Sequence, residues 1–168
     1  GFQKQWGGGI SYESPFLLNN LSYRTAVFAY PTNLGAFGLS IGQYGYSLYN
    51  ENKLGISYGQ RLSETFALGV QLNYLSTQIG EGYGTNSALS GTIGLFAKLN
   101  EDINLAAVVV NPNQAKLSSF QDERYPTLLK LGVGYSISKK VNLLSEVVKD
   151  IDYDAIAKVG IDYQALDI

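Results

Sequence analysis

Residues 66–74 read Phe-Ala-Leu-Gly-Val-Gln-Leu-Asn-Tyr, and every second side chain is large and apolar. Successive side chains of a β-strand point to opposite faces, so this alternation puts the large apolar groups on one face and small or polar groups on the other. The same alternation recurs at residues 54–62, 129–137 and 157–163. We therefore expect an all-β chain.

This pattern, followed along the 168 residues, predicts ten strands in a single domain, residues 1–168. Most are close to the ~9–11 residues that a tilted strand needs to cross a bilayer. The expected strands are residues 8–13, 21–30, 35–46, 53–62, 66–76, 88–99, 103–110, 127–137, 141–149 and 156–165.

The expected connections alternate in length. Short turns are expected at residues 31–33, 63–65, 100–102 and 138–140, and longer loops at residues 14–20, 47–52, 77–87, 111–126 and 150–155. Short turns at one end and long loops at the other are typical of an antiparallel up-and-down transmembrane β-barrel, whereas a Greek-key sandwich gives no such alternation.

Composition narrows the possible functions. Charged residues make up 15% of the chain, against about 25% in ordinary soluble domains. The longest purely apolar run, residues 105–110, is far shorter than the ~20 residues of a membrane-spanning helix. The chain has no Cys and no His, which excludes disulfides, thiolate sites and Ser-His catalysis. With a net charge of -2 and no basic stripe, nucleic acid is not an expected partner.

The face opposite the apolar one consists mainly of Gly, Ser, Ala, Asn and Gln, whereas the solvent face of a soluble sheet is rich in Lys, Glu and Thr. A charge facing lipid at the bilayer midplane costs ~2–4 kcal/mol. We therefore expect the charges inside strands to share the inward face and form a lumen-facing polar ladder: Arg24, Arg61, Lys98, Lys130, Glu146, Lys158 and Asp162. A soluble β-barrel binding protein remains the alternative.

Tyrosines recur near the expected short turns. The chain has 13 Tyr, and Tyr58 and Tyr135 each come shortly before such a turn. An aromatic belt at a membrane interface would sit at this depth. The alternative is that tyrosine simply favours strands.

Several stretches carry a family resemblance: residues 37–51, 69–77, 111–117, 122–132, 145–150 and 160–163. Their order along the chain resembles a family of Bacteroidota outer-membrane proteins related to the type IX secretion barrels (PorV/PorQ-like) and, more distantly, to FadL-type fatty-acid transporters. The resemblance implies a barrel of ~14 strands with an N-terminal plug, so we expect the chain to be incomplete at both ends. A self-contained ten-stranded barrel is the alternative.

The resemblance also implies a location in the bacterial outer membrane, contact with its lipid, and a role as a non-enzymatic accessory or scaffold component of a secretion or envelope assembly. The more distant resemblance, to FadL-type transporters, implies a porin-like role in the transport of hydrophobic small molecules. That role would need an apolar pocket around Phe28, Tyr44 and Phe96. We expect no enzymatic activity and no cofactor.

The longest expected loop, residues 111–126, combines charges with aromatic groups, as a surface that holds a protein partner does. Its candidate residues are Lys116, Phe120, Asp122, Glu123, Arg124 and Tyr125. The alternative is a solvated loop packed over the barrel mouth.

Two acidic patterns are weak candidates for chemistry. Glu146 and Asp162 are the carboxylates of neighbouring strands, but a solvated charge ladder explains them more simply than catalysis. Asp150, Asp152 and Asp154 alternate like the start of a calcium loop, yet the required Gly and the terminal Glu of that motif are missing. We therefore expect no metal site.

Overall fold

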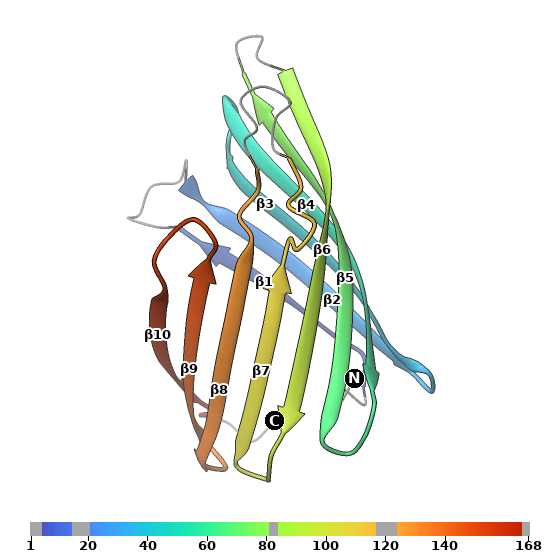
Figure 1. Cartoon of the computed structure of the whole chain (residues 1–168), viewed down its shortest axis with the longest axis vertical. Coiled ribbons are helices and arrows are strands. Elements are labelled where there is room, and N and C mark those ends of the chain that lie inside the picture. Colours follow the sequence, from blue (N-terminus) through green and yellow to red (C-terminus); the bar gives the residue numbers. More distant parts are fainter. Residues whose placement is uncertain (1–4, 15–20, 81–83, 117–123, 166–168) are drawn as a thin grey trace.

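The structure is a computed structural model that describes residues 5–14, 21–80, 84–116 and 124–165. Its regular structure is ten strands, coloured along the chain in Figure 1. They are β1 Gly7–Glu13, β2 Tyr23–Thr32, β3 Gly35–Tyr46, β4 Tyr49–Arg61, β5 Phe66–Ile79, β6 Gly84–Lys98, β7 Ile103–Val110, β8 Leu128–Ser138, β9 Val141–Asp150 and β10 Ile156–Tyr163.

The ten strands form one sheet in the order of the sequence, and each strand pairs antiparallel with the next (Figure 1). This confirms the predicted all-β, up-and-down meander. Within the described residues β1 pairs only with β2 and β10 only with β9, so the sheet is open between them. We call the end with the β2–β3, β4–β5, β6–β7 and β8–β9 connections the turn end, and the opposite end the loop end.

None of the described segments is a helix long and apolar enough to cross a membrane.

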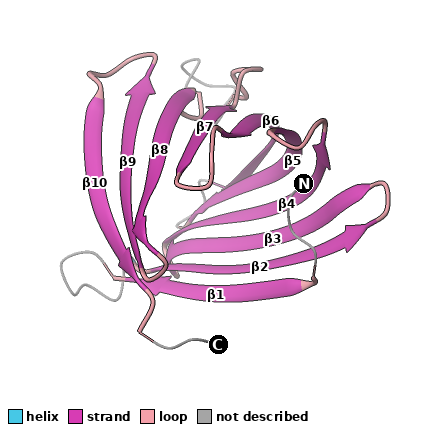
Figure 2. Ribbon diagram, turned by 90° about the horizontal axis from the view of Figure 1, so that it is seen from below, coloured by secondary structure: helices cyan, strands magenta, loops and turns pink. Residues whose placement is uncertain are grey.

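The sheet is strongly curled, as the end-on view in Figure 2 shows. Neighbouring residues of β5 therefore differ sharply in exposure: Leu72 is 56% exposed, whereas Asn73 is 1% exposed. We call the face that carries Leu72 the convex face and the face that carries Asn73 the concave face. Directly paired residues of antiparallel strands point to the same side, so strand register assigns every strand residue to one of these faces.

The convex face is apolar across the sheet. Along β5 it carries Phe66, Leu68, Val70, Leu72 and Tyr74, all exposed. At ~3.3 Å per residue, these side chains cover about 26 Å of strand. The described strands place only two charged residues on this face, Arg24 and Lys149, and both lie near the loop end.

Little apolar surface is buried within the sheet. Among the described residues, the buried apolar side chains are Ala67 and Ala115, while the polar Ser22, Asn73, Thr77, Ser90 and Asn111 are also buried. Curvature brings the side chains of the concave face together and spreads those of the convex face apart. The sheet therefore has its polar side inside.

Three strands extend beyond their predicted ends by three or more residues. β4 begins at Tyr49, β5 runs to Ile79 and β6 begins at Gly84, so the loops predicted at residues 47–52 and 77–87 were wrong. Polar side chains occupy both faces of these extensions, so apolar and polar residues no longer alternate. The backbone pairing between the strands nevertheless continues. The alternation of short and long connections is therefore only partly present.

The β3–β4 connection is a tight hairpin that depends on Gly45. Tyr46 pairs with Tyr49, which leaves two residues in the turn. Gly45 has a φ of +96°, and a Cβ atom there would lie 2.1 Å from the carbonyl oxygen of Tyr49. Only glycine fits this conformation and this close approach.

Candidate functional site on the concave face

Register places six of the seven residues of the predicted ladder on the concave face. They are Arg61, Lys98, Lys130, Glu146, Lys158 and Asp162. Arg61, Glu146 and Lys158 lie in one row across the sheet, joined through small residues and Phe96 of the intervening strands.

Arg24 and Phe28 were wrongly assigned to the inward face. Arg24 pairs with Gln43, and Phe28 pairs with Leu39, whose partner in β4 is Ile56. Both residues therefore lie on the convex face. From Ala26 to Tyr30 every residue of β2 is apolar, so both faces of the strand are apolar there. The sequence of β2 alone therefore does not show which face points inward.

The two carboxylates considered for acid–base chemistry do not form a pair. The Glu146 Oε1 atom lies 3.6 Å from the Lys158 Nζ atom in an exposed salt bridge. Asp162 instead pairs with Asn142. It lies four residues beyond Lys158 in β10, which is about 13 Å along the strand. This arrangement fits an ion-paired surface.

A cluster of hydrogen-bonded polar residues, of which Asn73 and Ser90 are buried, occupies the middle of the concave face; we call it the amide cluster. Its residues are Ser40, Gln71, Asn73, Ser90 and Thr92. The Gln71 amide donates to Ser40 Oγ at 3.3 Å and also to Asn73 Oδ1. Asn73 Nδ2 in turn donates to the Ser90 carbonyl at 3.3 Å and to Thr92 Oγ1 at 3.2 Å. The cluster ties β3, β5 and β6 together.

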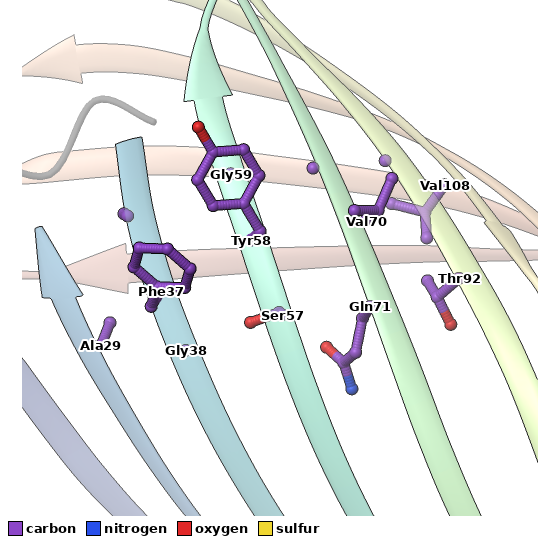
Figure 3. Close-up of a pocket in the computed structure, with 13 residues that line it drawn as sticks. Ala29, Phe37, Gly38, Ser57, Tyr58, Gly59, Val70, Gln71, Thr92 and Val108 are labelled. Atoms are coloured by element: carbon purple, nitrogen blue, oxygen red, sulfur yellow. The ribbon is translucent and has the colours of Figure 1, made fainter. Parts of the chain in front are cut away.

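A hollow of about 330 Å³ lies beside the amide cluster, towards the turn end (Figure 3). Gly59, Gly69 and Gly94 pair with one another across three strands and supply part of its lining, together with Gln71 and Thr92. Three glycines in one row leave no side chains above the backbone, which opens space for solvent or a ligand.

A second polar cluster lies nearer the loop end. The Tyr49 hydroxyl donates to the Glu51 carboxylate, and the hydroxyls of Thr77 and Tyr125 hydrogen-bond at 2.9 Å. Glu51 and Thr77 pair directly across β4 and β5, so both side chains point to the concave side. Burial, together with the nearby Glu51 charge, raises the pKa of the Tyr125 phenol, although its hydrogen bond to Thr77 acts in the opposite direction.

Asn111 fixes the described ends of the β7–β8 loop against the sheet. It is 1% exposed and has a φ of +56°. Its side chain donates to the Tyr125 carbonyl at 2.8 Å and accepts from the Ala115 amide at 2.9 Å. Its backbone amide donates to the Gly91 carbonyl of β6 at 2.8 Å.

Asn113 continues this contact along β6, which extends beyond the end of β7. It accepts from the Gly91 amide and donates to the Leu89 carbonyl, both at 2.9 Å. The Asn113 side chain thus replaces the backbone hydrogen bonds that β6 would make to a longer β7.

The predicted partner loop divides into an inner and an outer part. Tyr125 turns inward to Thr77, while Lys116 and Arg124 form an isolated antiparallel bridge and are exposed. Phe120, Asp122 and Glu123 lie outside the described residues.

The turn end of the concave face has a larger and more apolar hollow, of about 510 Å³. Phe96, Ala106, Gly132 and Leu144 contribute to its lining, and the salt bridge of Glu146 borders it. Of the three residues expected to surround an apolar pocket, Phe96 lines this hollow. Tyr44 faces the concave side near the loop end, opposite Glu51, and Phe28 is on the other face.

Aromatic side chains gather at the turn end of the convex face. Both tyrosines singled out in the sequence lie there: Tyr58 packs against Phe37 at a ring distance of 5.1 Å, and Tyr135 is 45% exposed. Trp6 contacts the ring of Phe28 at 6.3 Å on the same face.

The aspartates of the β9–β10 connection form a turn rather than a ligand cage. Asp150 Oδ1 accepts the backbone amide of Asp152 at 3.1 Å. No group of three or more acidic residues that could hold a metal ion occurs in the described part of the chain.

Comparison of the chain with protein-family models, with curated proteins and with solved structures finds no match.

Proposed function

We propose that this chain forms the wall of a bacterial outer-membrane β-barrel and acts as a non-enzymatic accessory or scaffold component of an envelope assembly. One observation carries the membrane part of the proposal, namely that the apolar face of the curled sheet is the outer one. A soluble protein rarely exposes an apolar patch larger than a few hundred Å², whereas here large apolar side chains are exposed on every strand.

The position of the charged groups supports the same proposal. Between the turn end and the two loop-end charges, Arg24 and Lys149, the described strands place no charged residue on the convex face. Lys149 donates to the Tyr153 carbonyl in the adjoining connection, which draws its ammonium towards the loop end. The apolar length of about 26 Å along β5, tilted as barrel strands are, fits an outer-membrane hydrocarbon layer.

The scaffold part of the proposal rests on the loop end. Asn111 and Asn113 fix the start of the β7–β8 loop to β6, so its exposed bridge between Lys116 and Arg124 is held on a defined base. Charged side chains held at defined positions give a protein partner a surface of constant shape.

Site-specific cross-linking in native outer membrane tests the scaffold role. A photoreactive residue at Arg124 is expected to yield one discrete cross-linked band, whereas the same group at Glu64, in the turn-end β4–β5 connection, yields none of that size. Identical patterns at both positions, or no band from either, would count against a partner at the loop end.

A second candidate, transport of hydrophobic small molecules, is favoured by the apolar hollow near Phe96. Its volume of about 510 Å³ is within the usual range for small-ligand sites. If the hollow holds such a ligand, Gly132→Leu should fill it and abolish saturable binding of an apolar fluorescent probe. Unchanged binding in this variant would argue against the candidate.

A further inference from the structure

A polar hollow of about 420 Å³ lies at the loop end of the convex face, beside the β3–β4 hairpin. Arg24 of β2, Gln43 of β3 and Asn50 of β4 contribute to its lining. Arg24 pairs with Gln43, and Gln43 pairs with Asn52, two residues from Asn50, so these side chains point to the convex side. The hollow therefore lies at the rim of the face that we propose to meet lipid.

This rim is where the convex face changes from apolar to polar. Ile41 and Leu54 pair with each other and are 52% and 44% exposed. Two residues further along the same strands, Gln43 pairs with Asn52 and, on its other side, with Arg24. The two rows are about 7 Å apart. A lipid chain that contacts Ile41 and Leu54 would bring its headgroup to the hollow.

The charge at this rim favours an anion. The described strands place no carboxylate on the convex face. In the described part of the chain, no hydrogen bond and no ion pair within 4.0 Å includes the Arg24 guanidinium. Lys149, the other charge of this face, instead donates to the Tyr153 carbonyl. The donors of Arg24 are therefore left for a ligand.

Side-chain amides line the same hollow. Asn50 is held by its neighbours, since its Oδ1 atom accepts from Asn52 at 2.8 Å and its Nδ2 atom donates to Gln78 at 3.3 Å. An amide nitrogen carries a second hydrogen, so Asn50 keeps a donor for a further acceptor. The hollow thus combines a guanidinium with amide donors.

We propose that this hollow binds the phosphate headgroup of an anionic membrane lipid, with the Arg24 guanidinium as its main ligand and the lipid chains against Ile41 and Leu54. The planar fork of arginine binds phosphate through paired charge-assisted hydrogen bonds. The volume of the hollow is within the usual range for small-ligand sites. The inference rests on the proposed lipid contact of the convex face and adds a place where that face selects one class of lipid.

Quenching of a tryptophan reporter by brominated lipid tests the site in vesicles. Ile41→Trp in a Trp6→Phe background places the only tryptophan of the chain two residues from Gln43 on the convex face. Phosphatidylcholine vesicles contain the same small fraction of either brominated phosphatidylglycerol or brominated phosphatidylcholine. We expect phosphatidylglycerol to associate with the reporter site about tenfold more strongly, which corresponds to one charge-assisted hydrogen bond.

Three variants in the reporter background identify the group responsible. Arg24→Gln should abolish the preference for phosphatidylglycerol. Arg24→Lys keeps the charge but loses the planar fork, so it should reduce the preference without abolishing it. Lys149→Gln removes the other charge of the convex face, which is not part of the hollow, and should leave the preference unchanged.

The headgroup site is wrong if both lipids quench the reporter equally, if Arg24→Gln keeps the preference, or if Lys149→Gln loses it. It is also wrong if sodium phosphate removes the preference and sodium chloride of equal ionic strength does not, because the ligand would then be a free anion. Equal quenching by both lipids leaves the proposed membrane location standing. Quenching by neither would overturn the lipid contact itself, and the headgroup site with it.

Discussion

The convex and concave faces of the sheet are built from the same strands and invert the usual relation between hydropathy and burial. Leu72 and Asn73 are neighbours, yet the leucine is 56% exposed and the asparagine 1% exposed. In a soluble β-sandwich the apolar face packs inward and the polar face meets water. Curvature, rather than hydropathy, therefore decides what is buried here.

The two faces also differ in what stabilises them. On the concave side, amide and hydroxyl groups satisfy one another, as at Asn73, so a buried polar surface is not left with unpaired donors. On the convex side, large apolar groups such as Leu72 are exposed, and a surrounding apolar phase would supply their contacts. The following substitutions separate the two faces.

The largest expected effect comes from a lysine on the convex face. Val133 is convex and 43% exposed, while Leu144 is concave and 47% exposed, so the two form a matched pair. Val133→Lys should lower the free energy of unfolding from lipid vesicles by ~2–4 kcal/mol, and Leu144→Lys by under ~1 kcal/mol. Urea titration followed by circular dichroism measures both. Equal losses would mean that the faces meet the same medium.

The next effect breaks the amide cluster. Asn73→Ala leaves Gln71 and Thr92 without their buried partner and should cost ~1–3 kcal/mol in the same titration. Asn52→Ala is the control, because Asn52 is exposed and its bond is to the neighbouring Asn50, so a change within ~0.5 kcal/mol is expected. A cluster variant as stable as this control would show that the buried hydrogen bonds contribute nothing.

A smaller and more local effect is expected at the β7–β8 loop. Asn111→Ala removes two side-chain hydrogen bonds and places Ala at a φ of +56°, so the loop should open more often. Exchange of the Ala115 amide proton, read by NMR, should accelerate about tenfold, which corresponds to one lost hydrogen bond. Asn111→Gly, which tolerates the backbone angle, separates the two causes. Unaltered exchange in both variants would refute the anchoring role.

The smallest effect concerns Tyr125. Its pKa is raised, so the folded state holds the phenol proton more firmly than the unfolded chain, and the associated stability is present below pH ~10 and is lost at higher pH. The difference in absorbance at 295 nm between the native chain and Tyr125→Phe should show a phenol that titrates above pH 10. A midpoint at or below 10 would place Tyr125 in water.

The sequence predicted strand number, meander order and the side of most strand residues, because alternation of apolar and polar residues follows the strand period directly. The prediction failed for Arg24, because β2 has apolar residues on both of its faces. Only the pairing of β2 with Leu39 and Gln43 of β3 shows which face is which. It also failed where polar residues such as Asn50 and Asn52 extend β4 beyond the apolar band.

The contacts within the concave face were beyond sequence reasoning. The amide cluster joins residues from three strands, and their approach depends on the strand register and on the curl of the sheet. In the sequence Asn111 resembled an ordinary loop residue. The only pattern that marks it is an asparagine directly after an apolar strand, and many turns have that pattern.

Fluorescence of Trp6 tests directly whether the convex face meets lipid. This residue is the one tryptophan of the chain, is 70% exposed and contacts Phe28 on the convex face. In vesicles of brominated lipid we expect strong quenching of Trp6, and in a Trp6→Phe background strong quenching for Val133→Trp but not for Leu144→Trp. Quenching of Leu144→Trp alone, or of none of the three, would show that the convex face does not meet lipid.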